Sequence, residues 1–246
     1  FIVKSPKKLN KLKLAFITGA TKGIGRSTAI TFANAGWDLI LLSRSMDLLE
    51  KLKSELFTTK SKISLVKCDL SKPLEIENCV KEAIKKYGCP SVLINNAGCA
   101  FNGSLVEMDL GQWEQTMQIN LTSIFQICKS IVPQMRKNGG LVINVSSHAS
   151  YNAFPQWGAY CISKSALAML TKCLREEERS NSIRACTITL GSVNTPLWDS
   201  ESINSDFDRT SMLSSSEVSD TILYMAQKPE SQLIEDLTLM PSGGAF

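Results

Sequence analysis

The sequence predicts an α/β fold of the Rossmann type, in which a doubly wound, seven-stranded parallel sheet lies between two layers of helices (three layers, α/β/α). Short apolar runs rich in Ile, Val and Leu alternate with longer amphipathic segments from end to end, as expected for strands that crossover helices cover on both faces. A glycine-rich turn at residues 18–25 follows the first apolar run, which is typical of the first strand-to-helix connection in such sheets.

Each strand is expected where an apolar run ends in turn-forming or polar residues. The runs predict strands at residues 12–18, 38–43, 63–68, 91–95, 141–146, 182–190 and 234–240. Amphipathic segments predict helices in most gaps, the two longest at about 110–136 and 158–179. Right-handed crossovers then place a ligand beyond the carboxyl ends of the strands, where Gly19, Asn95, Ser147 and Gly191 each follow or end a predicted strand.

Composition indicates a single domain. With 246 residues, of which 43% are hydrophobic, the chain is long enough to bury one full core. We assign residues 12–246 to this domain and expect a mobile flap at about 194–216, a segment rich in Ser, Asp and Asn. The net charge is only +4, and the lysines at positions 4, 7, 8, 11 and 13 favour a solvated basic leader at 1–11 over nucleic-acid binding.

The cysteines indicate a reduced protein without a metal site. The eight cysteines show neither CxxC nor Cys/His spacing and His148 is the only histidine, so no zinc site is expected. Most of them lie in apolar stretches, where a thiol behaves as a small hydrophobe, and this favours a cytoplasmic location. No apolar run reaches the ~18 residues of a membrane span, and no signal-peptide core is expected.

Two motifs carry chemistry. Gly19, Gly23 and Gly25 form GxxxGxG before a helix expected to begin at Ile24. Without Cβ atoms such a turn brings backbone N–H groups close to a pyrophosphate, although an ordinary glycine-rich turn is the alternative for this motif alone. The second motif is YCISK at residues 160–164, whose spacing puts its phenol and its ammonium group on one helix face.

A serine completes the second motif. Ser147 lies thirteen residues before Tyr160, at the end of LVINVSS. A phenol, the ammonium group of Lys164 and a nearby hydroxyl are what proton transfer to a carbonyl oxygen requires. Ser146 is the competing serine, but neighbours on a strand point to opposite sides.

Together with NNAG at residues 95–98, these motifs resemble the short-chain dehydrogenase/reductase family over roughly residues 12–243. The resemblance implies hydride transfer between a nicotinamide and a carbonyl carbon, with Tyr160 exchanging a proton with the carbonyl oxygen. Lys164 and the positive nicotinamide of the oxidised cofactor would together lower the pKa of the phenol, and Lys164 would also hold the ribose. Ser147, which the family spacing selects over Ser146, would donate a hydrogen bond to the substrate oxygen. The family also implies that Asn120 holds a relay water, the alternative being a polar helix residue satisfied locally.

The resemblance assigns the cofactor site as well. Asp69 would bind the adenine edge, its alternative being a cap of the helix near Pro73. In LGSVNT, Leu190 stands where the family has a proline, yet the contact with the nicotinamide carboxamide is expected to be kept. The residues expected to bind the cofactor are Gly19, Thr21, Lys22, Gly23, Ile24, Gly25, Ser43, Arg44, Asp69, Leu70, Asn95, Ala97, Gly98, Tyr160, Lys164, Gly191, Val193 and Thr195.

NADP(H) is the expected cofactor because of the end of the second strand. NAD-binding sheets commonly place a carboxylate about 20 residues past the glycine turn. This chain has Ser43 there, followed by Arg44, and Lys22 lies inside the turn. A 2′-phosphate would therefore meet a hydroxyl and two cations instead of a negative charge.

The expected substrate is a small carbonyl compound. Aromatic residues between Ser147 and Tyr160 and in the flap are expected either to wall an apolar pocket or to serve packing and subunit contacts; they are Phe101, Tyr151, Phe154, Trp157 and Trp198. The carboxyl-terminal segment resembles NADP-dependent 3-hydroxy acid dehydrogenases, which implies a 3-oxo or 3-hydroxy acid. The alternative is a 3-oxoacyl-[acyl-carrier-protein] reductase.

Other functions are weighed against this one. His148 next to Ser147 invites a Ser–His hydrolase interpretation, but no GxSxG elbow surrounds that serine. A catalytically silent nucleotide-binding or scaffold protein is a further alternative, which the intact Asn120, Ser147, Tyr160 and Lys164 disfavour. The family also implies a homodimer or homotetramer in which the two longest helices pair between subunits.

Overall fold

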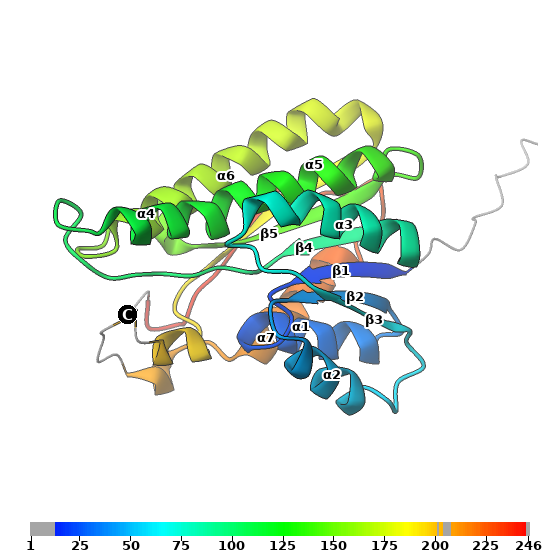
Figure 1. Cartoon of the computed structure of the whole chain (residues 1–246), viewed down its shortest axis with the longest axis horizontal. Coiled ribbons are helices and arrows are strands. Elements are labelled where there is room, and N and C mark those ends of the chain that lie inside the picture. The colour runs from blue at the N-terminus through cyan, green and yellow to red at the C-terminus, as the bar shows by residue number, and fades with distance from the viewer. Residues whose placement is uncertain (1–12, 201, 204–207, 245–246) are drawn as a thin grey trace, which may run out of the picture.

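A computed structural model describes residues 13–200, 202–203 and 208–244 (Figure 1). The predicted basic leader at 1–11 and residues 201 and 204–207 of the predicted flap lie outside the described residues. Seven parallel strands form one sheet in the order β3-β2-β1-β4-β5-β6-β7. The sequence order reverses between β1 and β4, as in a doubly wound sheet. The predicted fold class is confirmed.

All seven predicted strands are present, with small differences at their ends. The last strand is shorter than the predicted 234–240, and the fifth is longer than the predicted 141–146. The strands are β1 (Leu14–Thr18), β2 (Asp38–Ser43), β3 (Ile63–Lys67), β4 (Val92–Asn95), β5 (Gly140–Ser147), β6 (Ile183–Leu190) and β7 (Asp236–Leu239).

Helices cover both faces of the sheet (Figure 1). One layer holds α3 to α6, and the other holds α1, α2 and α7, with a separate apolar core on each side. The helices are α1 (Gly23–Asn34), α2 (Met46–Glu55), α3 (Pro73–Tyr87), α4 (Leu110–Met117), α5 (Ser123–Met135), α6 (Gly158–Glu178) and α7 (Ser215–Ala226).

The predicted continuous helix at 110–136 is wrong in one respect. A π-helical turn, Gln118–Thr122, separates α4 from α5. A π turn holds one residue more than an α turn and commonly occurs at functional sites. The apolar periodicity on either side does not reveal it, because the run stays helical throughout.

The predicted flap is partly structured. Its described residues include two 3₁₀ turns, Pro196–Asp199 and Arg209–Ser211, and a parallel bridge between Val193 and Leu213. Residues 215 and 216 belong instead to α7, which begins with a capping box between Ser214 and Glu217. The flap therefore ends earlier than predicted, and its mobility stays a prediction.

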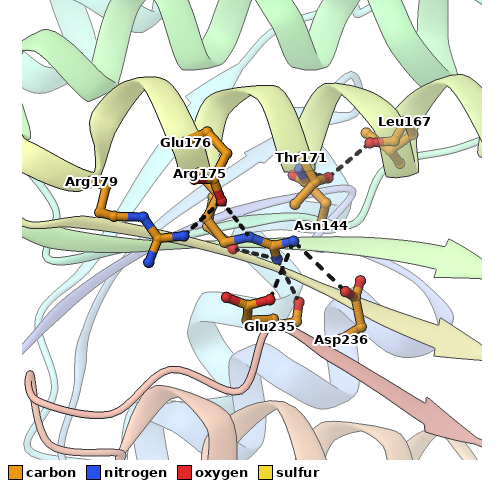
Figure 2. A network of polar contacts seen from close by, with 9 residues as sticks. Asn144, Leu167, Thr171, Arg175, Glu176, Arg179, Glu235 and Asp236 are labelled. Carbon is orange, nitrogen blue, oxygen red and sulfur yellow. Dashed lines mark hydrogen bonds and ion pairs between the residues drawn. The ribbon is translucent and has the colours of Figure 1, made fainter.

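On the face that packs under α6, the carboxyl-terminal halves of β5 and β6 are polar, whereas Val142, Ile183 and Ala185 on the same face belong to the apolar core. Alternate residues of both strands join the apolar core beneath α1 and α7, whereas Asn144 and Thr187, a pair in adjacent strands, lie on the opposite face. Asn144 donates a hydrogen bond to Thr171 of α6, which donates to the Leu167 carbonyl (Figure 2). Farther along α6, the buried Arg175 contacts carboxylates of residues 235 and 236 beside β7 (Figure 2).

Candidate active site

A large cleft lies at the carboxyl ends of the central strands. Its volume is about 1440 Å³, which exceeds the ~300–1,000 Å³ of usual small-molecule pockets and leaves room for a dinucleotide and a second ligand. Residues that follow β1, β2, β3, β4, β5 and β6 line it. The predicted site thus forms where a doubly wound sheet binds its ligand.

The glycine turn has the geometry that its sequence predicts. Gly19 and Gly23 both have positive φ angles, 63° and 48°, which side chains with a Cβ rarely adopt. Both line the cleft together with Thr21, Lys22 and Ile24. The helix begins at Gly23, one residue earlier than predicted.

Gly25 does not line the cleft, contrary to its predicted contact. A Cβ at Gly25 would lie 2.2 Å from the Gly19 carbonyl oxygen and 2.4 Å from the Asn96 amide nitrogen. Gly25 therefore allows the turn and α1 to pack closely, and its effect on a ligand is indirect.

The NNAG motif divides its two asparagines between core and cleft. Asn95 is 1% exposed, does not line the cleft and donates to Asn144 on the neighbouring strand at 2.8 Å, so it braces the central strands and its predicted contact with the cofactor is wrong. Asn96, which sequence reasoning missed, lines the cleft and donates to the carbonyls of Thr18 and Gly19. Strand alternation carries the signal, because Asn95 ends β4 facing inward. Ala97 and Gly98 line the cleft as predicted.

The end of the cleft that is predicted to hold the adenosine is built from residues at and after the ends of β2 and β3. The Ser43 hydroxyl lies 3.0 Å from that of Thr21, while Arg44 and Lys22 are exposed on the cleft wall. Within the described residues, neither cation has an acidic partner within ion-pair distance. This end of the site therefore offers a hydroxyl and two available positive charges.

Asp69 lies across the same end of the cleft, next to Leu70. Its carboxylate accepts from the backbone and hydroxyl of Ser71, and the first residue before α3 is Lys72, so Asp69 does not cap that helix. Burial acts to raise the pKa of Asp69, but the bonds from Ser71 and the charge of Arg44 outweigh it and lower the pKa. Asp69 therefore stays ionised, as an acceptor at the adenine edge must.

The residues after β6 close the floor of the cleft. Leu190 ends β6, pairs with Ser147 and Leu239, and so extends the strand where a proline lacks the N–H donor. Gly191, Val193 and Thr195 line the cleft. A Cβ on Gly23 would lie 3.1 Å from Thr195, so the two predicted cofactor segments meet across the cleft.

Tyr160 and Lys164 lie on one face of α6, as their spacing predicts. The Lys164 ammonium is buried, lies 5.7 Å from the centre of the Tyr160 ring and donates to the Val145 carbonyl at 3.0 Å. Burial lowers the pKa of Lys164 to about 8. The ammonium thus lies beside the phenol with one of its three donors used.

Burial dominates the environment of Tyr160. Burial raises the pKa of Tyr160 to about 12, and a side-chain hydrogen bond with Ser147 lowers it only in part. The lowering of this pKa expected from Lys164 together with the positively charged nicotinamide stays a prediction, because the chain's own groups supply only part of that charge. The phenol is protonated at neutral pH and suited to donating a proton.

Ser147 is the serine that reaches Tyr160. It ends β5, lines the cleft and also accepts from the backbone of Ala149 at 3.2 Å. Ser146 is buried, and its hydroxyl has no hydrogen-bond partner among the described residues. The proximity of Ser147 to Tyr160 agrees with the choice of Ser147, which rested on strand alternation together with the family spacing.

Asn120 is fully buried in the π-helical turn. Its amide accepts from the Cys99 N–H and donates to the Cys99 carbonyl, both at 2.9 Å, and donates to the Ser163 hydroxyl at 3.0 Å. These bonds fix the segment after NNAG against α6. A relay water held by Asn120 stays a prediction.

The other end of the cleft has aromatic walls. Phe101, Phe154, Trp157 and Trp198 line it, together with Leu197, which sequence reasoning missed. Of the five aromatic residues proposed for this pocket, Tyr151 is the exception: it is 56% exposed and does not line the cleft.

His148 also lines this end, but it does not activate Ser147. One of its ring nitrogens lies 2.9 Å from the side-chain amide of Asn152, whereas Ser147 bonds with Ala149 and Tyr160. The site therefore lacks the serine–histidine contact that a hydrolase of that type requires. Within the described residues, no cluster of metal ligands forms, and no helix is long and apolar enough to cross a membrane.

The nucleotide-sized cleft at the carboxyl ends of the strands, with a protonated phenol at one end, is typical of a Rossmann-fold oxidoreductase. Residues 13–206 match the family model for short chain dehydrogenases. The chain therefore belongs to the short-chain dehydrogenase family, and the resemblance seen in its motifs is confirmed.

Similar proteins agree with this assignment. An uncharacterized oxidoreductase of Staphylococcus saprophyticus is 30% identical over 94% of this chain and 97% of its own length. A farnesol dehydrogenase of Aedes aegypti is 30% identical over 95% of this chain and 98% of the relative. A solved alcohol dehydrogenase of the archaeon Thermococcus sibiricus, complexed with 5-hydroxy-NADP, is 26% identical and covers 94% of this chain and 97% of its own, with a TM-score of 0.86.

The family and the fold together establish the general activity of the protein. The protein is an oxidoreductase of carbonyl or alcohol substrates, and it uses a nicotinamide nucleotide.

Proposed function

We propose that the protein interconverts a carbonyl compound and a secondary alcohol with NADP(H), using Tyr160 as the acid and base. One observation carries the proposal. Tyr160, Ser147 and the buried Lys164 line a single cleft, whose other end presents Ser43, Arg44 and Lys22.

In reduction, the protonated Tyr160 donates to the carbonyl oxygen while Ser147 shares the charge that develops there. A bound NADPH supplies the hydride. Lys164 holds positive charge beside the phenol, which stabilises the phenolate left after proton transfer. In oxidation Tyr160 must first lose its proton, and its raised pKa means that the chain's own groups favour the protonated form.

The choice of NADPH is supported by the adenosine end. The Ser43 hydroxyl is oriented by Thr21, and the exposed Arg44 lies close enough to Asp69 to lower its pKa. A 2′-phosphate at this position accepts hydrogen bonds from Ser43 and Arg44, and Lys22 adds a second positive charge. The Thermococcus sibiricus relative was solved with an NADP derivative, which agrees with this choice.

The substrate is proposed to be a small carbonyl compound, the class that contains the 3-oxo acids expected from the carboxyl-terminal resemblance. A 3-oxoacyl chain on a carrier protein is the alternative. Acetoacetyl-carrier protein reduced faster than every free carbonyl compound would favour that alternative.

The quaternary structure and location are proposed on two observations. Exposed apolar side chains on α5 and α6, Phe125, Ile162 and Met169, are 53%, 41% and 59% exposed, which supports a homodimer or homotetramer paired through these helices. All eight cysteines are free, which supports the reducing cytoplasm.

The test is consumption of NADPH with a panel of small ketones and aldehydes, followed by absorbance at the nicotinamide band. Turnover that exceeds that of the Tyr160→Phe variant supports the proposal. Tight NADPH binding without turnover of any compound would favour the catalytically silent alternative.

A further inference from the structure

We propose that the substrate end of the cleft selects an uncharged carbonyl compound that carries an aromatic or bulky hydrocarbon group, in preference to a 3-oxo acid. The inference deepens the proposed function and rests on it. It depends on the aromatic residues that line this end of the cleft, on the charged groups near them and on the hydrogen bonds between the segments of the wall.

Aromatic rings surround the proton donor. The ring of Trp157 lies 5.8 Å from that of Tyr160 at an interplanar angle of 72°, and 5.8 Å from that of Trp198 at 63°. Trp198 is held in place, because its indole N–H donates to the Val193 carbonyl at 2.8 Å. Both tryptophans therefore present ring faces and edges, with Phe101 and Phe154 nearby on the wall, to whatever lies against the Tyr160 hydroxyl.

The charges at this end do not favour a carboxylate. The cations on the described wall are Lys22 and Arg44 at the adenosine end and the buried Lys164. The ionic group at the substrate end is Asp199, which is paired with Arg209. A substrate carboxylate here would lose its hydration against indole rings and gain no cation, and such desolvation is strongly unfavourable.

Arg209 and His148 do not compensate for this. Arg209 is not part of the wall, and besides Asp199 it donates to the Asn194 amide oxygen at 2.9 Å and to the Thr195 carbonyl at 3.0 Å. His148 bonds with Asn152. The polar groups nearest the aromatic wall thus already bond within the protein.

Three segments close the far side of this pocket. Asn102 N–H donates to the Ser202 carbonyl at 3.1 Å, and Gly103 N–H donates to the Gln156 carbonyl at 2.9 Å. The Ser202 hydroxyl donates to the Ala100 carbonyl at 2.7 Å. The wall after β4, the aromatic segment before α6 and the flap are therefore bonded to each other, which holds the aromatic wall against the rest of the cleft.

The experiment compares matched ketone pairs in which a carboxylate is replaced by its uncharged methyl ester. The pairs are 4-acetylbenzoate with its methyl ester, and acetoacetate with methyl acetoacetate, each with NADPH and the full chain. We expect kcat/KM for each ester to exceed that for its acid by about a hundredfold or more, an order of magnitude set by burying an unpaired charge. Equal values, or a preference for the acids, would overturn the inference.

A binding readout covers the case in which turnover is slow. The quenching of tryptophan fluorescence by each compound, in the presence of NADP⁺, reports its occupation of the pocket beside Trp157 and Trp198. Tighter binding of the ester supports the inference even without turnover, and tighter binding of the acid contradicts it.

A variant with an added positive charge sharpens the test. Leu197 lines the pocket beside Trp198, and Leu197→Arg supplies the missing cation, with Leu197→Met as the control of similar length. The Arg variant should narrow the ester-to-acid ratio at least tenfold, whereas the Met variant should keep it. An unchanged ratio in Leu197→Arg, at wild-type NADPH affinity, would show that charge at this end does not select the substrate.

These outcomes are separable from the proposed function. If Tyr160→Phe keeps full turnover, the proposed chemistry is wrong whatever the substrate. If Tyr160→Phe abolishes turnover while acids remain the better substrates, the chemistry stands and only the inference about the substrate fails.

Discussion

The two faces of the sheet contribute to the site in different ways. On the α1 side the glycine turn is proposed to bind phosphate through backbone groups, and the strand residues beneath it are apolar, as Val145 and Ile188 show. On the α6 side the proposed chemistry belongs to the side chains of Tyr160 and Lys164, and the same strands present Asn144 and polar neighbours. Backbone binding is compatible with an apolar core, whereas proton transfer requires ionisable groups to be buried, which is unfavourable for stability.

Some buried polar groups on the α6 side have no hydrogen-bond partner among the described residues. Asn144, Thr171 and the Leu167 carbonyl form a hydrogen-bonded chain (Figure 2), but the hydroxyls of Ser146, Thr187 and Thr189 have no partner among the described residues. Substitutions on this side should therefore change turnover, pH dependence and stability. Substitutions at the cofactor end should change cofactor choice alone.

The largest effect is expected at Tyr160. Tyr160→Phe removes the proton donor and keeps the ring, so turnover should fall by at least about a hundredfold, within the ~10²–10⁴ range of general acid–base catalysis. NADPH affinity, measured by fluorescence titration, should stay nearly unchanged. Comparable turnover in the Phe variant would remove Tyr160 from the mechanism.

Lys164→Ala provides the contrast to that variant. It should weaken both turnover and NADPH binding, because the ammonium is proposed to contact the ribose as well as to support the phenol. Normal NADPH affinity in Lys164→Ala would contradict the contact with the ribose.

The next effect is a pH dependence of stability caused by Lys164. Its pKa falls from 10.5 to about 8 on folding, which corresponds to roughly 3 kcal/mol against the charged form. Between pH 8 and 10 the unfolded chain keeps this proton and the folded chain loses it, so the free energy of unfolding gains a contribution that rises with pH.

Lys164→Met isolates that contribution. The free energy of unfolding, from urea titrations under reducing conditions, should be higher in the Met variant near pH 7, and the difference from wild type should shrink towards pH 10. Above pH 10 the raised pKa of Tyr160 acts in the opposite direction, so the comparison stops there. A difference in the free energy of unfolding that does not change with pH would show that burial does not shift the pKa of Lys164.

A smaller effect, limited to the affinity for the cofactor, is expected from substitutions on the α1 side of the sheet. Arg44→Ala should weaken NADPH roughly ten- to a hundredfold, since charged hydrogen bonds contribute ~1.5–3 kcal/mol, and should hardly affect NADH. Ser43→Asp should turn the preference towards NADH by repelling the 2′-phosphate. Tighter binding of NADH than of NADPH by the wild type would refute this reading of the end of β2.

The smallest effect compares two neighbours on β6 that face opposite sides. Thr187→Val keeps the shape and removes an unpartnered hydroxyl, so it should stabilise the fold by about 1 kcal/mol. Ile188→Val, on the apolar side, should destabilise it by ~0.5–1.5 kcal/mol. Thermal unfolding checks both, and destabilisation by Thr187→Val would mean that its hydroxyl has a partner.

The sequence was sufficient for the fold and most of the cleft because strand runs and glycine turns are local signals. Gly19, Ser43 and Tyr160 could be placed from motif and spacing alone. Asn95 was misplaced, although the strand predicted at 91–95 already ended at this residue and strand alternation turns its side chain into the core. The pKa of Tyr160 was beyond reach, since it depends on burial by segments far apart in the chain.

The π-helical turn that carries Asn120 has a consequence for how the chain tolerates changes in length. Successive residues of an α-helix are separated by about 100° of rotation, so deleting Leu121 would let an ordinary helix run through and would turn Asn120 away from Cys99 and Ser163. The backbone hydrogen bonds of the helix would become more regular, but Asn120 would no longer hold the segment after NNAG against α6. At this point the number of residues in the chain, and not only their identity, determines whether the enzyme works.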